Sequence, residues 1–147
     1  MYASRSKMVF AAACSALAML ASGCSGLGVD DTKAGLSCVD DTPECVASRQ
    51  ATLNAMLADK ENKWVREPAT PQAHASGVRL FAFRTRKKEL NCEELAYARR
   101  EADGAAKILR GPDGKGLSPA QISRATMFAA EVSKELTAEM RSRRCKA

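Results

Sequence analysis

The feature that most constrains the fold of this chain is a set of helix-start signals spread along its length. Three hydroxyl residues directly precede a proline: Thr42-Pro43, Thr70-Pro71 and Ser118-Pro119. A hydroxyl caps the first free N–H groups of a helix, and proline fits its first position because the N–H there needs no partner. Asn91 with Glu94, and Ser118 with Gln121, have the spacing of a reciprocal capping box. These signals predict four helix starts.

The apolar residues of the last two predicted helices follow the same periodicity. Spacings of three and four place side chains on one helix face. One such series is Cys92, Leu95, Ala98, Ala102, Ala105 and Leu109, and the next is Ile122, Ala125, Ala129, Val132, Leu136 and Met140, with Phe128 beside it. The glycine-rich segment 111–116 breaks the helix between them. We therefore expect an antiparallel helix pair that the alanines allow to pack closely.

The first two predicted helices are less regular. A helix over residues 43–65 would bury Val46, Leu53, Leu57 and Trp64. The centre of the segment 71–88, residues 78–83, is apolar except for Arg79 and also suits a strand, but a lone strand has no partner. We therefore predict a helix there. The expected fold is all-α, a small up-down four-helix bundle with two disulfides over residues 42–147, preceded by a signal helix and a flexible tether.

The N-terminal segment has the parts of an export signal. Arg5 and Lys7 precede an uncharged run over residues 9–20, which is too short to span a bilayer as a mature helix. The following Leu-Ala-Ser-Gly-Cys, residues 20–24, resembles the lipobox of bacterial lipoproteins, with alanine where the family usually has leucine. The resemblance implies a signal peptide over 1–23, a lipid on Cys24, and a tether over 24–41. The alternative is an ordinary secretory signal, with Cys24 a plain thiol.

The remaining cysteines favour disulfides. Cys14 lies inside the apolar run and would leave with the signal, so four cysteines remain besides the lipid site: Cys38, Cys45, Cys92 and Cys145. An even number in an exported chain suggests two bridges, for which three pairings exist. The up-down topology would place all four at one bundle end, which leaves every pairing open. We favour Cys38–Cys45 and Cys92–Cys145. With no CxxC motif and a single histidine, His74, we expect no metal site.

Charge points to surfaces rather than nucleic acid. Beyond residue 23 there are 21 basic and 17 acidic residues, a net charge of +4, which is too small for a nucleic-acid-binding footprint. Two basic clusters end the second and fourth predicted helices: Arg84, Arg86, Lys87 and Lys88, and Arg141, Arg143, Arg144 and Lys146. Cations suit helix C-termini. The same clusters are candidates for contact with anionic headgroups, lipopolysaccharide or peptidoglycan, since the bundle would bring both to the cysteine end.

No catalytic pattern rises above this background. The chain has no nucleophile elbow, HExxH, Walker loop or Rossmann glycine motif. We interpret His74 as a structural or exposed histidine. The acidic residues Glu93, Glu94, Glu101 and Asp103 are expected to form a solvated face with Arg99 and Arg100. We therefore expect neither enzymatic activity nor a cofactor.

Two further stretches carry a second resemblance. Residues 90–95, LNCEEL, and 116–124, GLSPAQISR, resemble segments of small lipoproteins of alphaproteobacteria, a resemblance that implies no activity. The main functional prediction is a lipid-anchored, non-catalytic envelope protein that binds another envelope protein or glycan. The alternative is a membrane-active, toxic or lytic lipoprotein. Ser25 after the lipid cysteine favours the outer membrane, facing the periplasm, by the enterobacterial sorting rule.

Overall fold

The structure is a computed structural model that describes residues 31–146, and every regular element in that range is helical. The elements are α1 (Asp31–Ser37), α2 (Pro43–Ala58), the 3₁₀ turn η1 (Lys63–Arg66), α3 (Pro71–Ser76), α4 (Val78–Arg86), α5 (Cys92–Arg110), the 3₁₀ turn η2 (Pro112–Gly114) and α6 (Pro119–Ser142). This confirms the all-α prediction. The predicted signal peptide and Cys24 lie outside the described residues.

The four predicted helix starts are confirmed by their capping contacts. The Thr42 hydroxyl accepts from the Cys45 amide, and the Thr70 hydroxyl accepts from the Ala73 amide. At the starts of α5 and α6 both halves of a capping box are present: Asn91 with Glu94 and Ser118 with Gln121. Each cap gives a partner to a backbone N–H group that would otherwise have none. The polar pattern of the sequence therefore sets where these helices begin.

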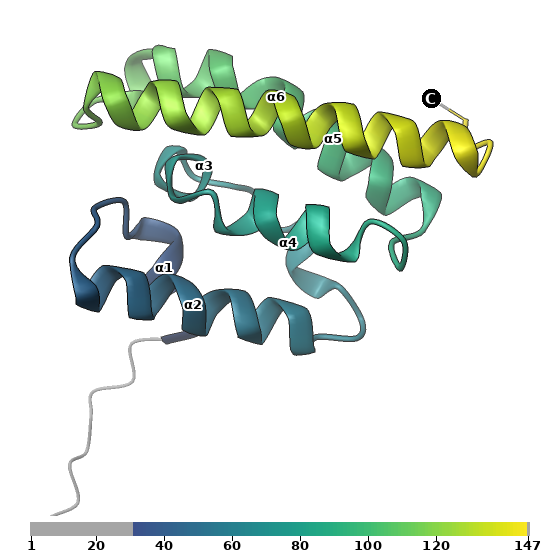
Figure 1. Ribbon diagram of the computed structural model, residues 1–147, viewed down its shortest axis with the longest axis horizontal. Coiled ribbons are helices and arrows are strands. Elements are labelled where there is room, and N and C mark those ends of the chain that lie inside the picture. Colours follow the sequence, from purple (N-terminus) through teal and green to yellow (C-terminus); the bar gives the residue numbers. More distant parts are fainter. Residues whose placement is uncertain (1–30, 147) are drawn as a thin grey trace, which may run out of the picture.

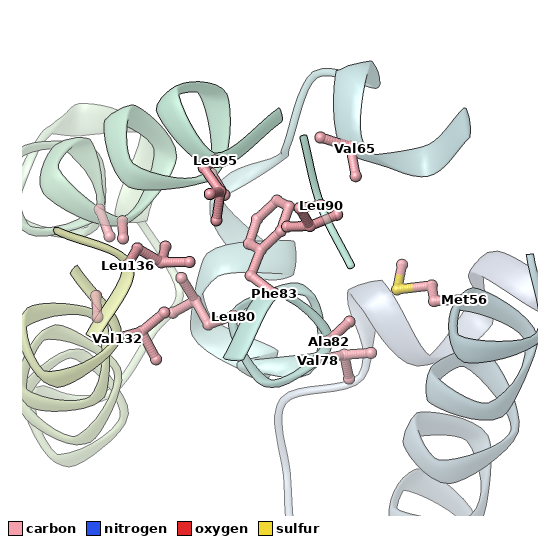
Figure 2. Close-up of a cluster of buried hydrophobic side chains, with 14 of the residues drawn as sticks. Met56, Val65, Val78, Leu80, Ala82, Phe83, Leu90, Leu95, Val132 and Leu136 are labelled. Carbon is pink, nitrogen blue, oxygen red and sulfur yellow. The ribbon is translucent and has the colours of Figure 1, made fainter. Parts of the chain in front are cut away.

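The helices stack in three layers (Figure 1), with α1 and α2 on one side, α3 and α4 in the middle, and α5 with α6 on the other side. The middle layer supplies the centre of the core. Leu80 and Phe83 of α4 are fully buried between Leu95 of α5 and Leu136 of α6 on one side and the α2 layer on the other (Figure 2). Phe83 also packs against Trp64, with 4.9 Å between the ring centroids.

The up-down topology is wrong in its first half. The start of α2 lies near the start of α6, since Gln121 donates to the Val39 carbonyl, and the end of α2 lies near the end of α4, since Arg86 donates to the Asp59 carbonyl. Helices α2, α4 and α6 therefore run in the same direction, and α5 runs against them (Figure 1). The reason is that α2 stops at Ala58, and the segment that follows leads the chain back before α4 begins.

The predicted helix over 71–88 is two helices. Gly77 ends α3 and begins α4 with a φ of 72°, a left-handed conformation that glycine adopts without steric cost. A Cβ on this residue would lie 3.6 Å from the ring of Phe128, so α6 packs directly against the break. The strand alternative for residues 78–83 is wrong, because this run forms α4.

The predicted tether is also wrong from Asp31 onwards, because α1 packs against α2. Gly35 is buried and donates its amide to the Thr52 hydroxyl at 3.0 Å. A Cβ on Gly35 would lie 2.5 Å from the Ser48 carbonyl oxygen, which no side chain tolerates. The glycine is therefore a close-packing residue of the domain. The earlier part of the expected tether, residues 24–30, lies outside the described residues.

Both favoured disulfide pairings are confirmed, Cys38–Cys45 and Cys92–Cys145, each with 5.4 Å between its Cα atoms. Their expected clustering at one end is wrong. The first bridge lies beside the start of α6, near Gln121, and the second lies at the end of that 24-residue helix. Helix α6 ends at Ser142, and Arg144 then takes a φ of 55°, which turns Cys145 towards Cys92.

Candidate functional site

An open groove runs between α2 on one side and α4 with the first part of α6 on the other. It has a volume of about 670 Å³. Its apolar lining consists mainly of Val39, Val46, Leu53, Leu57, Ala75, Val78, Phe81, Ala125 and Phe128, and its polar lining of Asp41, Arg49, Gln50, Ser76 and Arg124. A space of this size is typical of ligand and partner sites. The groove is therefore the candidate binding site of the domain.

Two large apolar side chains line this groove while half exposed to water. Val46 on α2 is 48% exposed, and Phe81 on α4 is 46% exposed. In a folded domain, most residues of this type lie in the core. Helix α2 buries few of its apolar residues because only part of its surface meets α4, whereas Leu53 and Leu57 are half-buried. The groove therefore exposes apolar surface that the fold has not covered.

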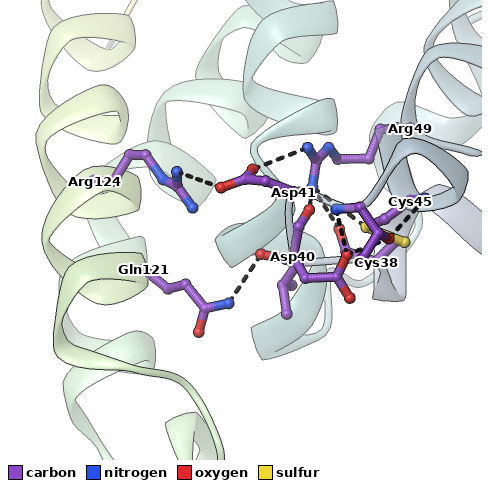
Figure 3. A network of polar contacts seen from close by, with 9 residues as sticks. Cys38, Asp40, Asp41, Cys45, Arg49, Gln121 and Arg124 are labelled. Carbon is purple, nitrogen blue, oxygen red and sulfur yellow. Dashed lines mark hydrogen bonds and ion pairs between the residues drawn. A yellow bond between two sulfur atoms is a disulfide. The ribbon is translucent and has the colours of Figure 1, made fainter. Parts of the chain in front are cut away.

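The polar end of the groove is built by a short loop that the Cys38–Cys45 bridge closes (Figure 3). Asp41 on this loop lies between two cations, with one carboxylate oxygen 3.4 Å from Arg49 and the other 3.2 Å from Arg124. Arg49 also donates to the Cys38 carbonyl, which anchors it. The loop is joined to α6 by the 2.9 Å hydrogen bond from Gln121 to the Val39 carbonyl.

The neighbouring Asp40 is held by its own loop. Hydrogen bonds from the Thr42 hydroxyl and the Thr42 amide hold the pKa of Asp40 below its ordinary value. Its carboxylate and the sulfurs of Cys38 and Cys45 lie within 4.8 Å of one another. Because the two sulfurs are bonded to each other, this trio lacks the free thiolates that a metal ion would need.

An ion pair lies at the centre of the fold, where the sequence suggested a solvated face. Arg79 on α4 and Glu101 on α5 have side chains that are 2% and 6% exposed, and two N–H groups of the guanidinium donate to the carboxylate at 2.8 and 2.6 Å. Arg79 also donates to the carbonyls of Trp64 and Glu67. The solvated-face prediction is therefore wrong for Glu101, and for Glu94, which is buried at the α5 cap. The pair joins the middle layer to α5.

His74 lies next to this pair and is buried in α3. Burial lowers the pKa of His74, Glu101 acts in the opposite direction, and Arg79 adds to the lowering. Its Nδ1 atom has no hydrogen-bond partner among the described residues. A neutral imidazole packed under α5 is consistent with the structural interpretation of this residue.

The two predicted basic clusters lie near each other, as expected, but their members differ. The ends of α4 and α6 are adjacent, since Arg143 donates to the Leu90 carbonyl. Three members of the first cluster pair within the domain: Arg86 with Glu89, Arg84 with Glu131 and Glu135, and Lys87 with Glu135. The others, Lys88, Arg141, Arg143, Arg144 and Lys146, are exposed. They lie at the opposite end from the Cys38–Cys45 loop.

The groove was not predicted from the sequence. Its members Val46, Leu53 and Leu57 were expected to be buried, and Phe81 and Arg124 were not singled out. The available signal was the irregular apolar pattern of α2, which is not the single stripe expected of a helix whose apolar face is fully covered by its neighbours.

No helix within residues 31–146 is long and apolar enough to cross a bilayer. Comparison with protein-family models, with characterised proteins and with solved structures found no match.

Proposed function

We propose that this protein is a lipid-anchored, non-catalytic component of the cell envelope that binds another envelope component in the groove between α2, α4 and α6. The lipobox-like segment ending at Cys24 supports the anchor. The observation that carries the binding role is that Val46 and Phe81 face one groove from opposite walls while half exposed. Apolar surface gathered in one hollow and flanked by polar groups is typical of a binding site.

The distribution of apolar surface favours this role over membrane disruption. Among the described residues, the large apolar side chains that are exposed are Val46, Phe81 and Met127. The first two line the groove and Met127 does not, so they form no continuous stripe along one helix. A helix that inserts into a bilayer needs such a stripe. The packing therefore supports a domain that holds a partner.

The polar groups of the groove also favour binding over catalysis. Asp41 pairs with both Arg49 and Arg124, and the Ser76 hydroxyl donates to the Ala73 carbonyl. Nucleophilic catalysis needs a hydroxyl or thiol next to a general base, and these four lining residues do not form that pair. The charged groups of this site are therefore suited to orienting a partner.

Photo-crosslinking in intact cells tests the binding role. A photo-reactive amino acid replaces Val46 or Phe81 in the groove, or Met127 as the matched control, which is 66% exposed outside it. We expect discrete crosslinked products from the two groove positions and none from position 127. Equal labelling at all three positions would overturn the groove as the site. Dye release from vesicles by the purified protein would instead support the membrane-active alternative.

Lipid labelling tests the anchor separately. We expect labelled palmitate to be incorporated by the wild-type chain and lost in Cys24→Ser, because a lipobox directs the lipid to this thiol. Palmitate labelling that persists in Cys24→Ser would overturn the lipoprotein assignment and leave the groove experiment unaffected.

A further inference from the structure

The shape and charge of the groove identify a class of partner, an inference that rests on the proposed binding function. We infer that the groove receives an amphipathic helix of a partner protein, with an acidic side chain of that helix against Arg124. Three observations carry this: the length of the apolar wall, the exposure of both walls, and the charges at one end.

The apolar wall formed by α2 has the dimensions of a helix-binding surface. Its apolar lining residues are Val46, Leu53 and Leu57, which follow one face of α2 over three turns, with the polar Gln50 between them and Arg49 near the loop end. At 1.5 Å per residue, this wall is roughly 16 Å long. Peptide helices that bind in grooves present anchors at positions i, i+3 or i+4, and i+7 over a similar length. The wall therefore matches the apolar stripe of a three-turn helix.

The exposure of the walls favours a helix over an acyl chain. Val46 and Phe81 are each about half exposed, so the groove is an open trough. An acyl chain is apolar on all sides and would keep much of its surface in water there, whereas small-molecule sites bury most of their ligand. An amphipathic helix needs only one face covered and leaves its polar face in solvent. The open trough therefore suits the helix.

The charged residues at the loop end of the groove determine which type of side chain the partner helix needs at that end. Two cations, Arg49 and Arg124, share the single carboxylate of Asp41. Arg49 is held by backbone carbonyls, whereas the Arg124 side chain is 60% exposed, and Asp41 is the partner that the structure gives it. A carboxylate arriving from a partner can therefore pair with Arg124 while Asp41 continues to neutralise Arg49. An acidic residue is the complementary group.

Selection from a displayed library of helical peptides tests the inference. The bait is the intact lipidated protein in nanodiscs, with empty nanodiscs used to remove membrane-binding peptides. We expect the selected peptides to carry apolar residues at helical spacing over about three turns and Asp or Glu near one end. Their affinity should fall at least tenfold with Phe81→Gln and stay unchanged with Met127→Gln. Circular dichroism checks that both variants are folded.

A charge exchange tests the acidic contact itself. Arg124→Glu should weaken a selected acidic peptide at least tenfold, and exchanging the acidic residue of the peptide for lysine should restore binding to that variant. Failure of this rescue would overturn the Arg124 contact. Selected peptides without helical spacing, or peptides insensitive to Phe81→Gln, would overturn the helix.

A second probe separates this inference from the proposed function. Fluorescent dodecanoate is added to the same nanodisc preparations. Dodecanoate binding that Phe81→Gln abolishes, with no peptide selected, would overturn the helical partner and keep the groove as a binding site. If neither probe binds and cells give no crosslink at Phe81, both proposals fall.

Discussion

The α5–α6 pair and the α1–α2 layer are both built from helices, but they differ in how much of their apolar surface is buried. In α5 and α6 most of the two apolar stripes is buried, with Ala98, Ala102, Ala105 and Ala129 all in the core. In α2 only Cys45, Thr52 and Met56 are buried, whereas Val46, Leu53 and Leu57 line an open groove. The difference teaches that a regular apolar stripe stabilises the fold by being buried, whereas the irregular pattern of α2 leaves apolar surface exposed, and this is the surface where we propose that a partner binds.

The largest effect is expected where the layers are joined, at Arg79 and Glu101. Arg79→Met leaves the Glu101 carboxylate buried without its counter-charge and removes donors from three backbone carbonyls. Removing one partner of a buried pair costs about 3–5 kcal/mol. We expect a loss of this size in the free energy of unfolding, measured by urea denaturation.

The double variant Arg79→Met/Glu101→Leu is the control for this pair. It removes the unpaired charge, so it should recover part of the lost stability. A single variant that costs under about 1 kcal/mol would show that the layers are held by apolar packing alone.

The disulfide that joins α5 to the end of α6 should stabilise the domain more than the disulfide at the start of α2. Cys92–Cys145 joins residues 53 positions apart, and Cys38–Cys45 joins residues 7 apart. Loop-closure entropy assigns them about 4 and about 2 kcal/mol. We expect Cys92→Ser/Cys145→Ser to lose more unfolding free energy than Cys38→Ser/Cys45→Ser. Equal losses would mean that the short loop contributes through contacts such as Gln121 to Val39.

Two leucines compare the regions directly. Leu136 in α6 is fully buried, whereas Leu53 in α2 is half-buried at the groove. Leu136→Ala should cost about 2–5 kcal/mol, since it removes buried apolar surface and leaves a cavity. Leu53→Ala should cost less than half as much. Denaturation that gives equal costs would show that α2 is as tightly packed as α6, and the comparison would fail.

The smallest expected effect is the loss of stability in acid that results from His74 in α3. Burial lowers the pKa of His74 below the ordinary 6.5, so the unfolded chain binds a proton more readily than the folded one. Stability is therefore complete above pH 6.5 and falls as pH drops through 6.5 towards the lowered folded-state pKa, by at most about 1.4 kcal/mol per pH unit. Denaturation at pH 7 and 5.5 measures the fall, which His74→Gln should abolish. An unchanged slope in that variant would assign the acid effect to other groups.

The sequence predicts best what depends on local chemistry. Thr42, Thr70, Asn91 and Ser118 were identifiable as caps because each bonds backbone within its own first turn. The α5–α6 pair was predictable because its stripes are regular and its connection is short. Both disulfide pairings were favoured correctly, although for a topology that the structure corrects.

What the sequence missed depends on contacts between distant segments. Gly35 belongs to the packed domain because it lies against Ser48 and Thr52 of α2. The residues next to Gly35 in the sequence do not indicate this contact. Glu101 was assigned to solvent because most charged residues are exposed, and it is buried because Arg79, which the carbonyls of Trp64 and Glu67 hold in the core, pairs with it. The groove was missed for a similar reason, because exposure of Val46 and Phe81 follows from where α2 and α4 fail to meet.

The short spacing of Cys38 and Cys45 also bears on the order in which the thiols oxidise. Among the four cysteines of the two bridges, the next-nearest pair, Cys45 and Cys92, would close a loop of 47 residues, at an entropic cost about 1.7 kcal/mol higher than that of the 7-residue separation. Cys38 and Cys45 therefore meet first in the unfolded chain. Once they are bonded, two of these four thiols remain, and the three possible pairings of the four reduce to one. A local bridge near the start of the domain thus removes the kinetic competition for the long-range bridge that completes it.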